Sequence, residues 1–548
     1  MNVLIHGTPF FCDAGIVQRY AGNHALRTFG PDDASDFTYS PLEESASEAI
    51  ARFSNQWRPD VLLCWQPEAH PPPRGIEDVP VRTVALVSDW NVYYPVLDKN
   101  LARFDVVLTD KPGVAIFSDE HVRAHHVRPL YSQITPIHQR YGEARDIDVL
   151  FVGNLNHAAH HERAHFLERL AKLSGRYRVV ITTGVEGEAY GRLMSRARIV
   201  FNHSIRGEVN LRVFETMACG AMAMLEEDNL EVRDWFRDGH DIVLYNASNF
   251  DERLAHYLEN PEEAERIAQT GYERVKSLSG EHTLDSIVDA AIALPIGGRR
   301  FHAFGELDRL LQTAIMYGRL PTKVWRPYVA GLLGHLLDSA PGDARVHAVY
   351  VHFLVGDPDP DWGRIREHAS QAAALAPNSI PYALNVLTVE GWSTSTKPDS
   401  STFIPLLEKS GIEGAGLLLG SQADPFWTRC YLLLAQGLLT ADFLHAEILV
   451  RSAATAESLE ERSRRIERAF ELDQDNHTGI LARAESLWLR GLRAEAIDQL
   501  TASLPKLPLD MHAREMLLDW SRASGDIDRW QSLTSETLQI LKAFPEAT

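Results

Sequence analysis

The sequence predicts two kinds of structure in series: two parallel α/β sheets, followed by an all-helical region. In the first half, short apolar runs alternate with segments of helical period, which is typical of parallel strands buried on both faces. After about Pro295, strand-like runs are almost absent, and leucine and alanine recur at helical spacing. The 548 residues also exceed what one core can hold and fit about three or four domains.

Apolar runs that end in a polar residue or a glycine mark the expected strands. The first series is 3–6, 61–65, 81–87 and 106–109, and the second is 148–152, 177–182, 199–202, 221–225 and 242–245. Segments of helical period, such as 161–173 and 211–219, lie between them. Because the second series starts after the turn-rich residues 141–146, we expect two Rossmann-like domains, 1–143 and 144–296. Ligands should bind at the carboxyl ends of their strands, in the cleft between the domains.

Residues 297–548 form the expected helical domain. Gly491 and Gly525 stand 34 residues apart, each between two segments of helical period. That period is typical of tetratricopeptide repeats, so we expect a tetratricopeptide-like solenoid. An ordinary helical bundle that shows one such spacing is the alternative. Gly297 and Gly298 are the expected hinge before this domain.

Charge and cysteine content exclude several classes of protein. The chain has 54 basic and 75 acidic residues, a net charge of −21, so neither nucleic acid nor an anionic membrane is expected as its principal partner. The sequence contains no run of about 18 apolar residues, so no membrane span is expected. The four cysteines, Cys12, Cys64, Cys219 and Cys430, are far apart and lack Cys-x-x-Cys spacing. We therefore expect a protein of the reducing cytoplasm.

The densest group of charged residues surrounds the start of the helix expected at 211–219. Arg206, Asn210 and Arg212 lie in the preceding loop and the first helical turn, and Glu215 follows one turn later. A helix N-terminus with nearby arginines binds anions, and a carboxylate can accept hydrogen bonds from ribose hydroxyls. This combination fits a nucleotide-diphosphate-sugar. A surface helix whose charges only interact with water is the alternative.

Four segments in order along the chain carry a resemblance to a known family. Residues 214–220, FETMACG, resemble the F-E-x-M-A-C-G element of GT-B glycosyltransferases, in particular the CgeB-type spore-maturation enzymes. Residues 148–155 resemble the strand and turn that open the donor domain, 236–245 a later loop and strand, and 257–271 with His282 the closing helices. The resemblance is strong over 148–293 and weak over 1–142, and it does not include the tail.

This resemblance implies a hexosyltransferase-like enzyme that transfers a sugar from a nucleotide-diphosphate-sugar donor, with no metal and no other cofactor. Glu215 would bind the donor ribose, and Arg212 would lie near the diphosphate and stabilise it as it leaves. The other expected donor-binding residues are Gly153, Asn154, Arg163, Gly184, Arg206 and Asn210.

One position departs from the family pattern. Related retaining enzymes carry a glutamate eight positions before the one that matches Glu215, and this chain has Gly207 there, with Glu208 one place later. The identity of the sugar and the choice between retention and inversion therefore stay open.

Residues of the first domain are expected on the acceptor side. Asp89 follows the strand expected at 81–87 and is the expected catalytic base or acceptor-orienting group, with Trp90 forming an acceptor wall. A helix N-cap is the alternative role for Asp89. His6 and Gly7 end the first strand and are placed on the acceptor side as well, although a histidine there can equally be a hydrogen-bonded core residue.

Three groups that look like metal ligands are assigned to solvated loops or helix turns. Asp32–Asp33 and Asp357 with Asp359 lie in proline-rich turn regions. His157 and His161 have i,i+4 spacing, but no cysteine or aspartate completes a set nearby.

The helical tail favours a protein or peptide acceptor, such as a serine or threonine side chain, because repeat solenoids present extended concave surfaces. It could instead form a homo-oligomer. Two other functions stay open. One is a catalytically inactive interaction scaffold, which Gly207 favours, and the other is a nucleotide-sugar epimerase.

Overall fold

The computed structural model describes residues 1–7, 20, 22–31, 35–53, 57–127, 135–156, 160–278, 280–296, 298–318, 323–393, 409–420 and 424–544. Contacts divide the chain into two units. The sheet-bearing unit is Met1–Ser88, Leu101–Arg299 and Ser535–Thr548, and the helical unit is Asp89–Asn100 and Arg300–Thr534. Both ends of the sequence thus belong to the sheet-bearing unit.

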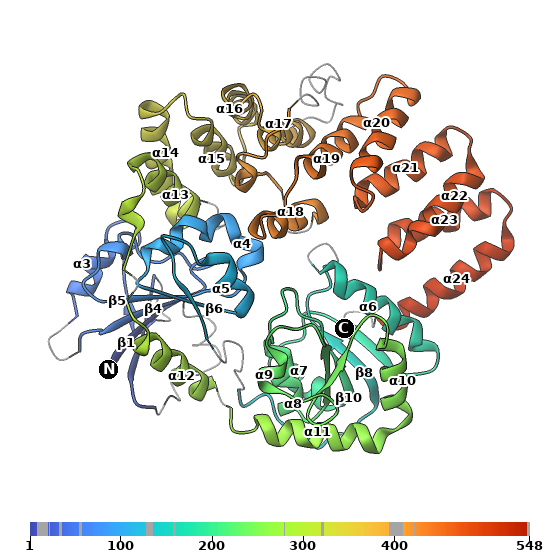
Figure 1. The fold of residues 1–548 in the computed structure, drawn as a ribbon, viewed down its shortest axis with the longest axis horizontal. Coiled ribbons are helices and arrows are strands. Elements are labelled where there is room, and N and C mark those ends of the chain that lie inside the picture. Colours follow the sequence, from blue (N-terminus) through green and yellow to red (C-terminus); the bar gives the residue numbers. More distant parts are fainter. Residues whose placement is uncertain are drawn as a thin grey trace. The chain divides into compact units, whose positions relative to one another are not determined.

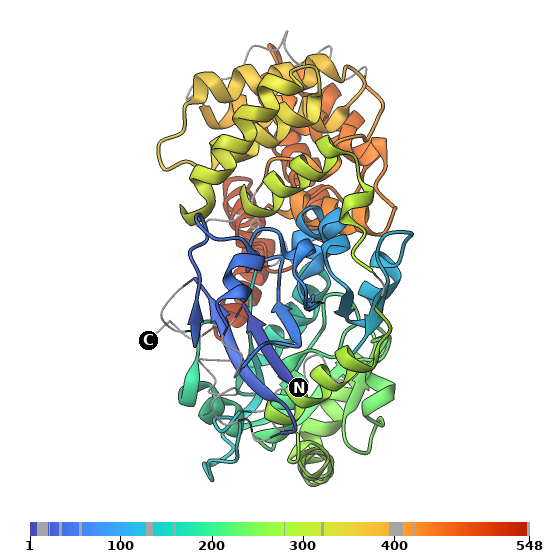
Figure 2. The ribbon, with the colours of Figure 1, turned by 90° about the vertical axis from the view of Figure 1, so that its left-hand side faces the viewer.

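The first sheet is parallel throughout, in the strand order β3-β2-β1-β4-β5-β6-β7. Its strands are β1 (Asn2–His6), β2 (Ala25–Gly30), β3 (Phe37–Thr38), β4 (Val61–Trp65), β5 (Arg82–Leu86), β6 (Val106–Thr109) and β7 (Ala124–His126), drawn in blue shades in Figures 1 and 2. The strands β2, β3 and β7 were not predicted. They are short or partly exposed, so they lack the continuous apolar run by which buried strands are recognised.

The second sheet is also parallel, in the order β12-β11-β10-β8-β9. Its strands are β8 (Ile147–Val152), β9 (Val179–Thr182), β10 (Ala197–Phe201), β11 (Met222–Glu226) and β12 (Val243–Tyr245). All five lie within two residues of the expected positions. The predicted fold class, two Rossmann-like parallel sheets followed by a helical region, is confirmed.

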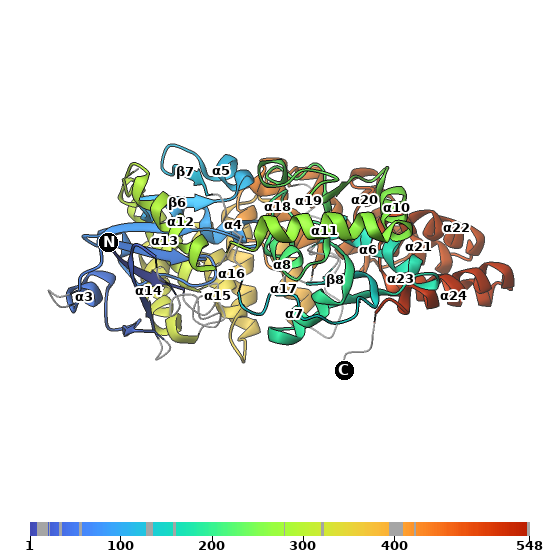
Figure 3. The same cartoon turned by 90° about the horizontal axis from the view of Figure 1, so that it is seen from below.

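Helices cover both sheets of this unit. They are α3 (Ala46–Ala51), α5 (Lys111–Phe117), α6 (His161–Ala171), α7 (Gly187–Ser195), α8 (Leu211–Ala218), α9 (Val232–Trp235), α10 (Phe250–Glu259), α11 (Pro261–Val275) and α12 (Gly280–Ala293). The long helix α11 lies beside α8 (Figure 3). Although α12 follows the second sheet in the chain, its Leu284, Ile287, Val288 and Ala291 join the core of the first sheet.

The helical unit contains α4 (Trp90–Leu97) and a long series of later helices (Figure 1). The series is α13 (Glu306–Gly318), α14 (Arg326–Ser339), α15 (Ala344–Val355), α16 (Trp362–Leu375), α17 (Ile380–Ser393), α18 (Pro425–Ala435), α19 (Ala441–Ala453), α20 (Leu459–Leu472), α21 (His477–Leu489), α22 (Arg493–Ser503), α23 (Met511–Ala523) and α24 (Ile527–Leu541). The division by contacts differs from the predicted boundaries, because α4 packs against α13 and α18 and the end of α24 groups with the sheets.

A 34-residue period is visible in the helix starts of this unit. The N-cap residues of α18, α20 and α22 are Asp424, Ser458 and Leu492, each 34 residues after the one before. Gly491 and Gly525 both adopt left-handed backbone conformations, with φ of 82° and 74°, in the turns that end α21 and α23. These turns explain the glycine spacing seen in the sequence. The tetratricopeptide identity of the repeats stays a prediction.

The end of α24 lies against the edge of the second sheet. The N–H of Ile181, in the edge strand β9, donates a hydrogen bond of 2.7 Å to the carbonyl of Ala543. Lys172 and Glu536 form an ion pair of 2.9 Å, and the hydroxyl of Ser174 donates to the carbonyl of Gln539. Unpaired N–H groups at a strand edge can pair with another chain. The end of α24 therefore protects this edge.

Replacing Ile540 with alanine should lower the stability of the sheet-bearing unit by about 2–4 kcal/mol, because the Ile540 side chain is fully buried at this edge and its removal leaves a cavity. Leu538→Ala, on the exposed side of the same helix, should change stability by less than about 0.5 kcal/mol. Thermal unfolding of both variants checks this prediction. Equal unfolding midpoints for the two would contradict it.

Within the described part of the chain, every helix is too short or too polar to span a membrane. Cys64, Cys219 and Cys430 are buried free thiols, and Cys12 lies outside the described residues.

Candidate active site

Two arginines meet at the carboxyl end of β8. Arg163 lies on α6, where its Nη2 donates to the carbonyl of Asn154 at 2.9 Å. Arg212 lies in the first turn of α8, where its Nη1 donates to Oδ1 of Asn202 at 2.6 Å. Both guanidinium groups lie over the ring of Phe151, with Cζ at 5.2 Å and 4.7 Å from its centroid. A Cβ atom at Gly153 would overlap Nη2 of Arg212, so a larger residue there would displace this guanidinium group.

Neither of these two arginines has an ion-pair partner within the described part of the chain. No carboxylate among the described residues forms an ion pair with Arg163 or Arg212, and the Nε atom of each is buried without a hydrogen-bond partner. Burial and the neighbouring Arg212 lower the pKa of Arg163 to about 9. Holding two like charges in a desolvated place is costly, so the arrangement is suited to a bound anion that offsets both.

The N-terminus of α8 adds positive electrostatic potential beside the two arginines. Its N-cap residue Asn210 does not cap the helix through its side chain. The Asn210 side chain exchanges hydrogen bonds with Asn202, at 2.8 Å and 3.3 Å. The positive end of the helix therefore stays available to a phosphate beside Arg212.

His160 precedes α6 and lies close to the same arginines. Burial lowers its pKa to about 3, and the positive charges of Arg163, Arg212 and Arg206 contribute to this shift. The imidazole is therefore neutral at pH 7. Its Nδ1 is buried and has no hydrogen-bond partner among the described residues.

Acid should destabilise the sheet-bearing unit through two histidines, because the pKa of both His160 and His6 falls from 6.5 to about 3. Below pH 6.5 the unfolded chain then binds more protons than the folded chain, so stability is lost as pH falls toward 3. Lowering pH from 7 to 5.5 should cost about 1 kcal/mol for each histidine. Thermal unfolding of His160→Gln should show a smaller midpoint drop than the unaltered chain, while a variant of the exposed His256 should show the full drop. An undiminished drop in His160→Gln would exclude this role.

Arg206 differs from the other two arginines because it forms ion pairs with two carboxylates. Its Nε lies 3.2 Å from Oδ2 of Asp110, and its Nη2 lies 3.7 Å from Oε1 of Glu208. All three side chains are almost fully buried. Asp110 follows β6 and also caps α5 by accepting from the N–H of Gly113 at 2.7 Å. The trio therefore links the first sheet to the loop before α8.

Gly207 has a left-handed backbone with φ of 83°, and its carbonyl accepts a hydrogen bond of 2.8 Å from the N–H of Leu230. A Cβ atom there would lie 3.3 Å from Cγ of Leu230. A glutamate at this position would be strained. The carboxylate of Glu208, one place later, accepts from the backbone N–H of Arg206 at 2.9 Å, and burial raises its pKa.

Glu215 is held by two neighbours. The hydroxyl of Tyr190, on α7, donates to its Oε2 at 2.6 Å, and Nε2 of His138 lies 3.4 Å from its Oε1. Burial and the carboxylate of Glu215 raise the pKa of Tyr190, which keeps the phenol protonated as a donor. Gly184 lies in the exposed loop before α7, with φ of 71° and open space around the position of a Cβ atom.

Residues 142–293 match the model of a family described as Glycosyl transferase-like. This segment contains all five strands of the second sheet, together with Arg163 and Arg212. We refer to this segment, by its similarity, as the glycosyltransferase-like domain. A search of curated proteins found none that matches the chain.

Several solved structures are similar to the chain at low identity. TarM is 10% identical with a TM-score of 0.32, over 42% of this chain and 54% of TarM. The pneumococcal O-GlcNAc transferase GtfA, solved with UDP and GlcNAc, is 9% identical with a TM-score of 0.31, over 42% and 56%. The T4 phage β-glucosyltransferase is 11% identical with a TM-score of 0.36, over 54% and 100%. The chain thus spans little more than half the length of the first two.

The residues expected on the acceptor side lie outside the glycosyltransferase-like domain. Nε2 of His6 lies 3.2 Å from the hydroxyl of Tyr39, and the imidazole is buried. Gly7 has φ of 85°, and a Cβ atom there would overlap the carbonyl of Trp65. Close approach of protein backbone therefore accounts for this glycine.

Asp89 and Trp90 begin the part of the chain that groups with the helical unit. Asp89 occupies the N-cap position of α4, but its side chain does not cap the helix. Trp90 is 1% exposed, so the structure does not present its indole as a wall. His161 and His165 stack edge to face at 4.8 Å, whereas His157 and Asp32–Asp33 lie outside the described residues.

Several residues of the site were not predicted from the sequence. They are His138, Tyr190, Asn202 and Asp110. Asp110 and Asn202 had a usable signal, because Asp110 directly follows an expected strand and Asn202 ends one, at the edge where ligands bind. His138 and Tyr190 show no pattern that marks them as neighbours of α8.

Proposed function

We propose that this chain transfers a sugar from a nucleotide-diphosphate-sugar to an acceptor. The observation that carries this proposal is the pair Arg163 and Arg212, which have no ion-pair partner among the described residues and lie beside an N-terminus of α8 that no side chain caps. A diphosphate leaves as an anion, and fixed positive groups accelerate such a step most where charge develops. The match of residues 142–293 to a glycosyltransferase-like family supports the same reaction.

Each of the residues around the arginines has a proposed task. Gly153 and Asn154 let the backbone approach the phosphates, and Glu215 accepts hydrogen bonds from the donor ribose. Gly184, in the open loop before α7, faces the base. Asp89 is the proposed base or acceptor-orienting group. The two arginines supply the charge that a metal ion could supply, so we propose a reaction that needs no metal.

The helical unit is proposed to select a protein or peptide acceptor. Its support is the 34-residue period of helix starts from Asp424 to Leu492, because repeated helix pairs form extended peptide-binding surfaces. Incubation of the full chain with its donor and serine- or threonine-containing peptides should increase peptide mass by one sugar. Donor hydrolysis with every peptide left unmodified would argue against a peptide acceptor.

The donor proposal is tested by calorimetry and thermal shift with UDP, GDP, CMP, TDP and their common sugars, all in EDTA. We expect saturable binding of one diphosphate family, lost in Arg212→Ala. Failure of every nucleotide to bind would overturn the proposal and leave the interaction-scaffold function. Conversion of the donor sugar without any acceptor would instead indicate an epimerase.

A further inference from the structure

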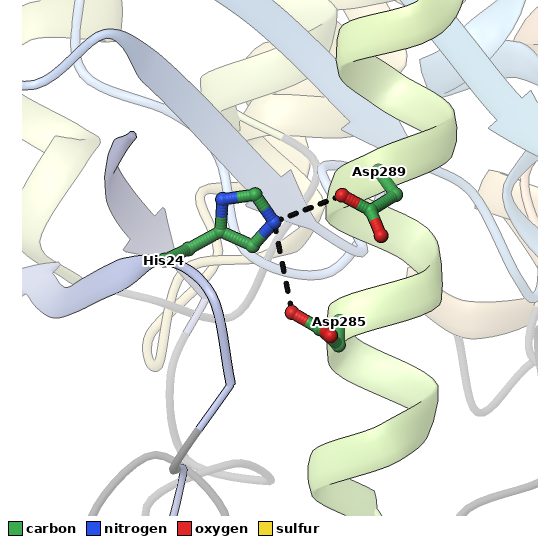
Figure 4. A group of neighbouring side chains, drawn as sticks. All are labelled: His24, Asp285 and Asp289. Carbon is green, nitrogen blue, oxygen red and sulfur yellow. Dashed lines mark hydrogen bonds and ion pairs between the residues drawn. The ribbon is translucent and has the colours of Figure 1, made fainter.

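Outside the candidate active site, one imidazole and two carboxylates converge beside the first sheet. His24 directly precedes β2, and Asp285 and Asp289 are one turn apart on α12. Nε2 of His24 lies 3.0 Å from Oδ1 of Asp289 and 3.6 Å from Oδ1 of Asp285. Figure 4 shows both carboxylates turned toward this nitrogen. One ligand atom from each residue lies within 4.8 Å of the other two.

We propose that His24, Asp285 and Asp289 bind one divalent cation, with zinc as the best fit. Zinc bonds to imidazole nitrogen and carboxylate oxygen are about 2.0–2.2 Å long, so neighbouring ligand atoms of a tetrahedral site are about 3.3–3.5 Å apart. The two distances from His24 bracket this value. Three protein ligands leave the fourth position to water.

The charges of the trio favour a cation. No lysine or arginine among the described residues forms an ion pair with Asp285 or Asp289, and their ion-pair partner is His24. Two carboxylates beside a single imidazole carry net negative charge, even when the imidazole is protonated. The Asp285 side chain is only 23% exposed, so water offsets its charge in part, and a divalent ion would neutralise the excess.

A fourth side chain orients one of the ligands. The hydroxyl of Tyr20 donates to Oδ1 of Asp285 and also accepts from the backbone N–H of His24 at 3.3 Å. A Cβ atom at Gly22 would lie 2.7 Å from Oδ1 of Asp285, so glycine leaves the room this arrangement needs. Such partners outside the ligand set orient the ligands of metal sites.

The position of the site indicates a structural role. His24 lies at the amino end of β2, whereas ligands of parallel sheets bind at the carboxyl ends. The ion would join this end of the first sheet to α12, which packs on the same sheet through Leu284 and Ile287. The ion would thus fasten α12 onto the first sheet, and donor binding would not depend on it.

The test is calorimetric titration of the EDTA-stripped full chain with Zn²⁺, and absorption spectroscopy after titration with Co²⁺. We expect one Zn²⁺ per chain and the visible absorption of tetrahedral Co²⁺. His24→Asn and Asp289→Asn should abolish both, and Tyr20→Phe should weaken binding by about 10-fold. His256→Asn is the matched control, because it removes an exposed histidine that is paired with a single carboxylate, Glu263, at 2.9 Å. It should bind Zn²⁺ as the unaltered chain does.

Absence of saturable Zn²⁺ binding, or equal affinity in the unaltered chain and Asp289→Asn, would overturn the proposal. Asp289 is 63% exposed, so its replacement should not prevent folding, and circular dichroism verifies this. Zn²⁺ should also raise the unfolding midpoint of the unaltered chain and leave that of Asp289→Asn unchanged. Nucleotide binding measured in parallel should be the same in both proteins, which separates this proposal from the proposed transferase function.

Discussion

Replacing Arg212 with methionine should weaken binding of the nucleoside diphosphate by about 100-fold and leave the fold as stable as before. The loss follows from removing one member of a desolvated charge contact with the ligand. The fold should not suffer, because Arg212 has no carboxylate partner among the described residues, and the Asn202 oxygen to which it donates also accepts from Asn210. Methionine keeps the apolar contact with Phe151 and removes the repulsion from Arg163.

Calorimetry and thermal unfolding measure the two halves of this prediction on the same sample. Arg169→Met is the matched control, since Arg169 lies on α6 but forms an exposed ion pair of 2.7 Å with Asp251. Its binding of the nucleotide should be unchanged. A large drop in the unfolding midpoint of Arg212→Met would show that this arginine is structural, and unchanged binding would remove it from the donor site.

The loss of nucleotide binding without a loss of stability, expected for Arg212→Met, reflects a general property of binding sites. Charged groups that are placed to bind a ligand destabilise the free protein, and binding of the ligand offsets this loss of stability. Arg206 shows the contrast within the same loop. Arg206 forms ion pairs with Asp110 and Glu208. Its replacement should therefore destabilise the link to the first sheet and weaken nucleotide binding only indirectly.

The sequence predicted the strands that are buried on both faces, because their apolar runs are continuous and carry their own signal. It did not predict β2 and β3, because part of β2 is exposed and β3 has two residues. In the candidate site, Arg212 and Glu215 were predictable because they share one helix with a recognisable motif. Tyr190 and His138, the partners of Glu215, were not, because they come from other elements of the chain.

Long-range contacts explain most of what the sequence could not show. Asp110 and Arg206 are 96 residues apart in the chain, and Tyr190 and Glu215 are 25 apart on different helices. The same limit hid the proposed cation site. His24 and Asp289 are 265 residues apart, and they meet because α12 returns to the first sheet after the second sheet has been completed.

Glu215→Ala should abolish the preference for ribose over 2′-deoxyribose in the bound nucleotide. A hydrogen bond from a hydroxyl to a carboxylate contributes about 1.5–3 kcal/mol, so the unaltered chain should bind the ribonucleotide about 10- to 100-fold more tightly than its 2′-deoxy form. Without the carboxylate, both forms should bind with the same, weaker affinity. Calorimetry with the two nucleotides and the two proteins gives the coupling between Glu215 and the hydroxyl directly.

This comparison distinguishes contact with the donor from an indirect role of Glu215. The carboxylate also accepts from Tyr190 and lies beside His138, so its loss alone could loosen the site and weaken any nucleotide. In that case both nucleotides would lose affinity in Glu215→Ala, while the preference for ribose would persist. Glu188→Ala, which removes an exposed partner of Arg192 on α7, should retain both the affinity and the preference. A ribose preference that survives in Glu215→Ala would therefore assign the hydroxyl contact to another residue and leave Glu215 as support for Tyr190.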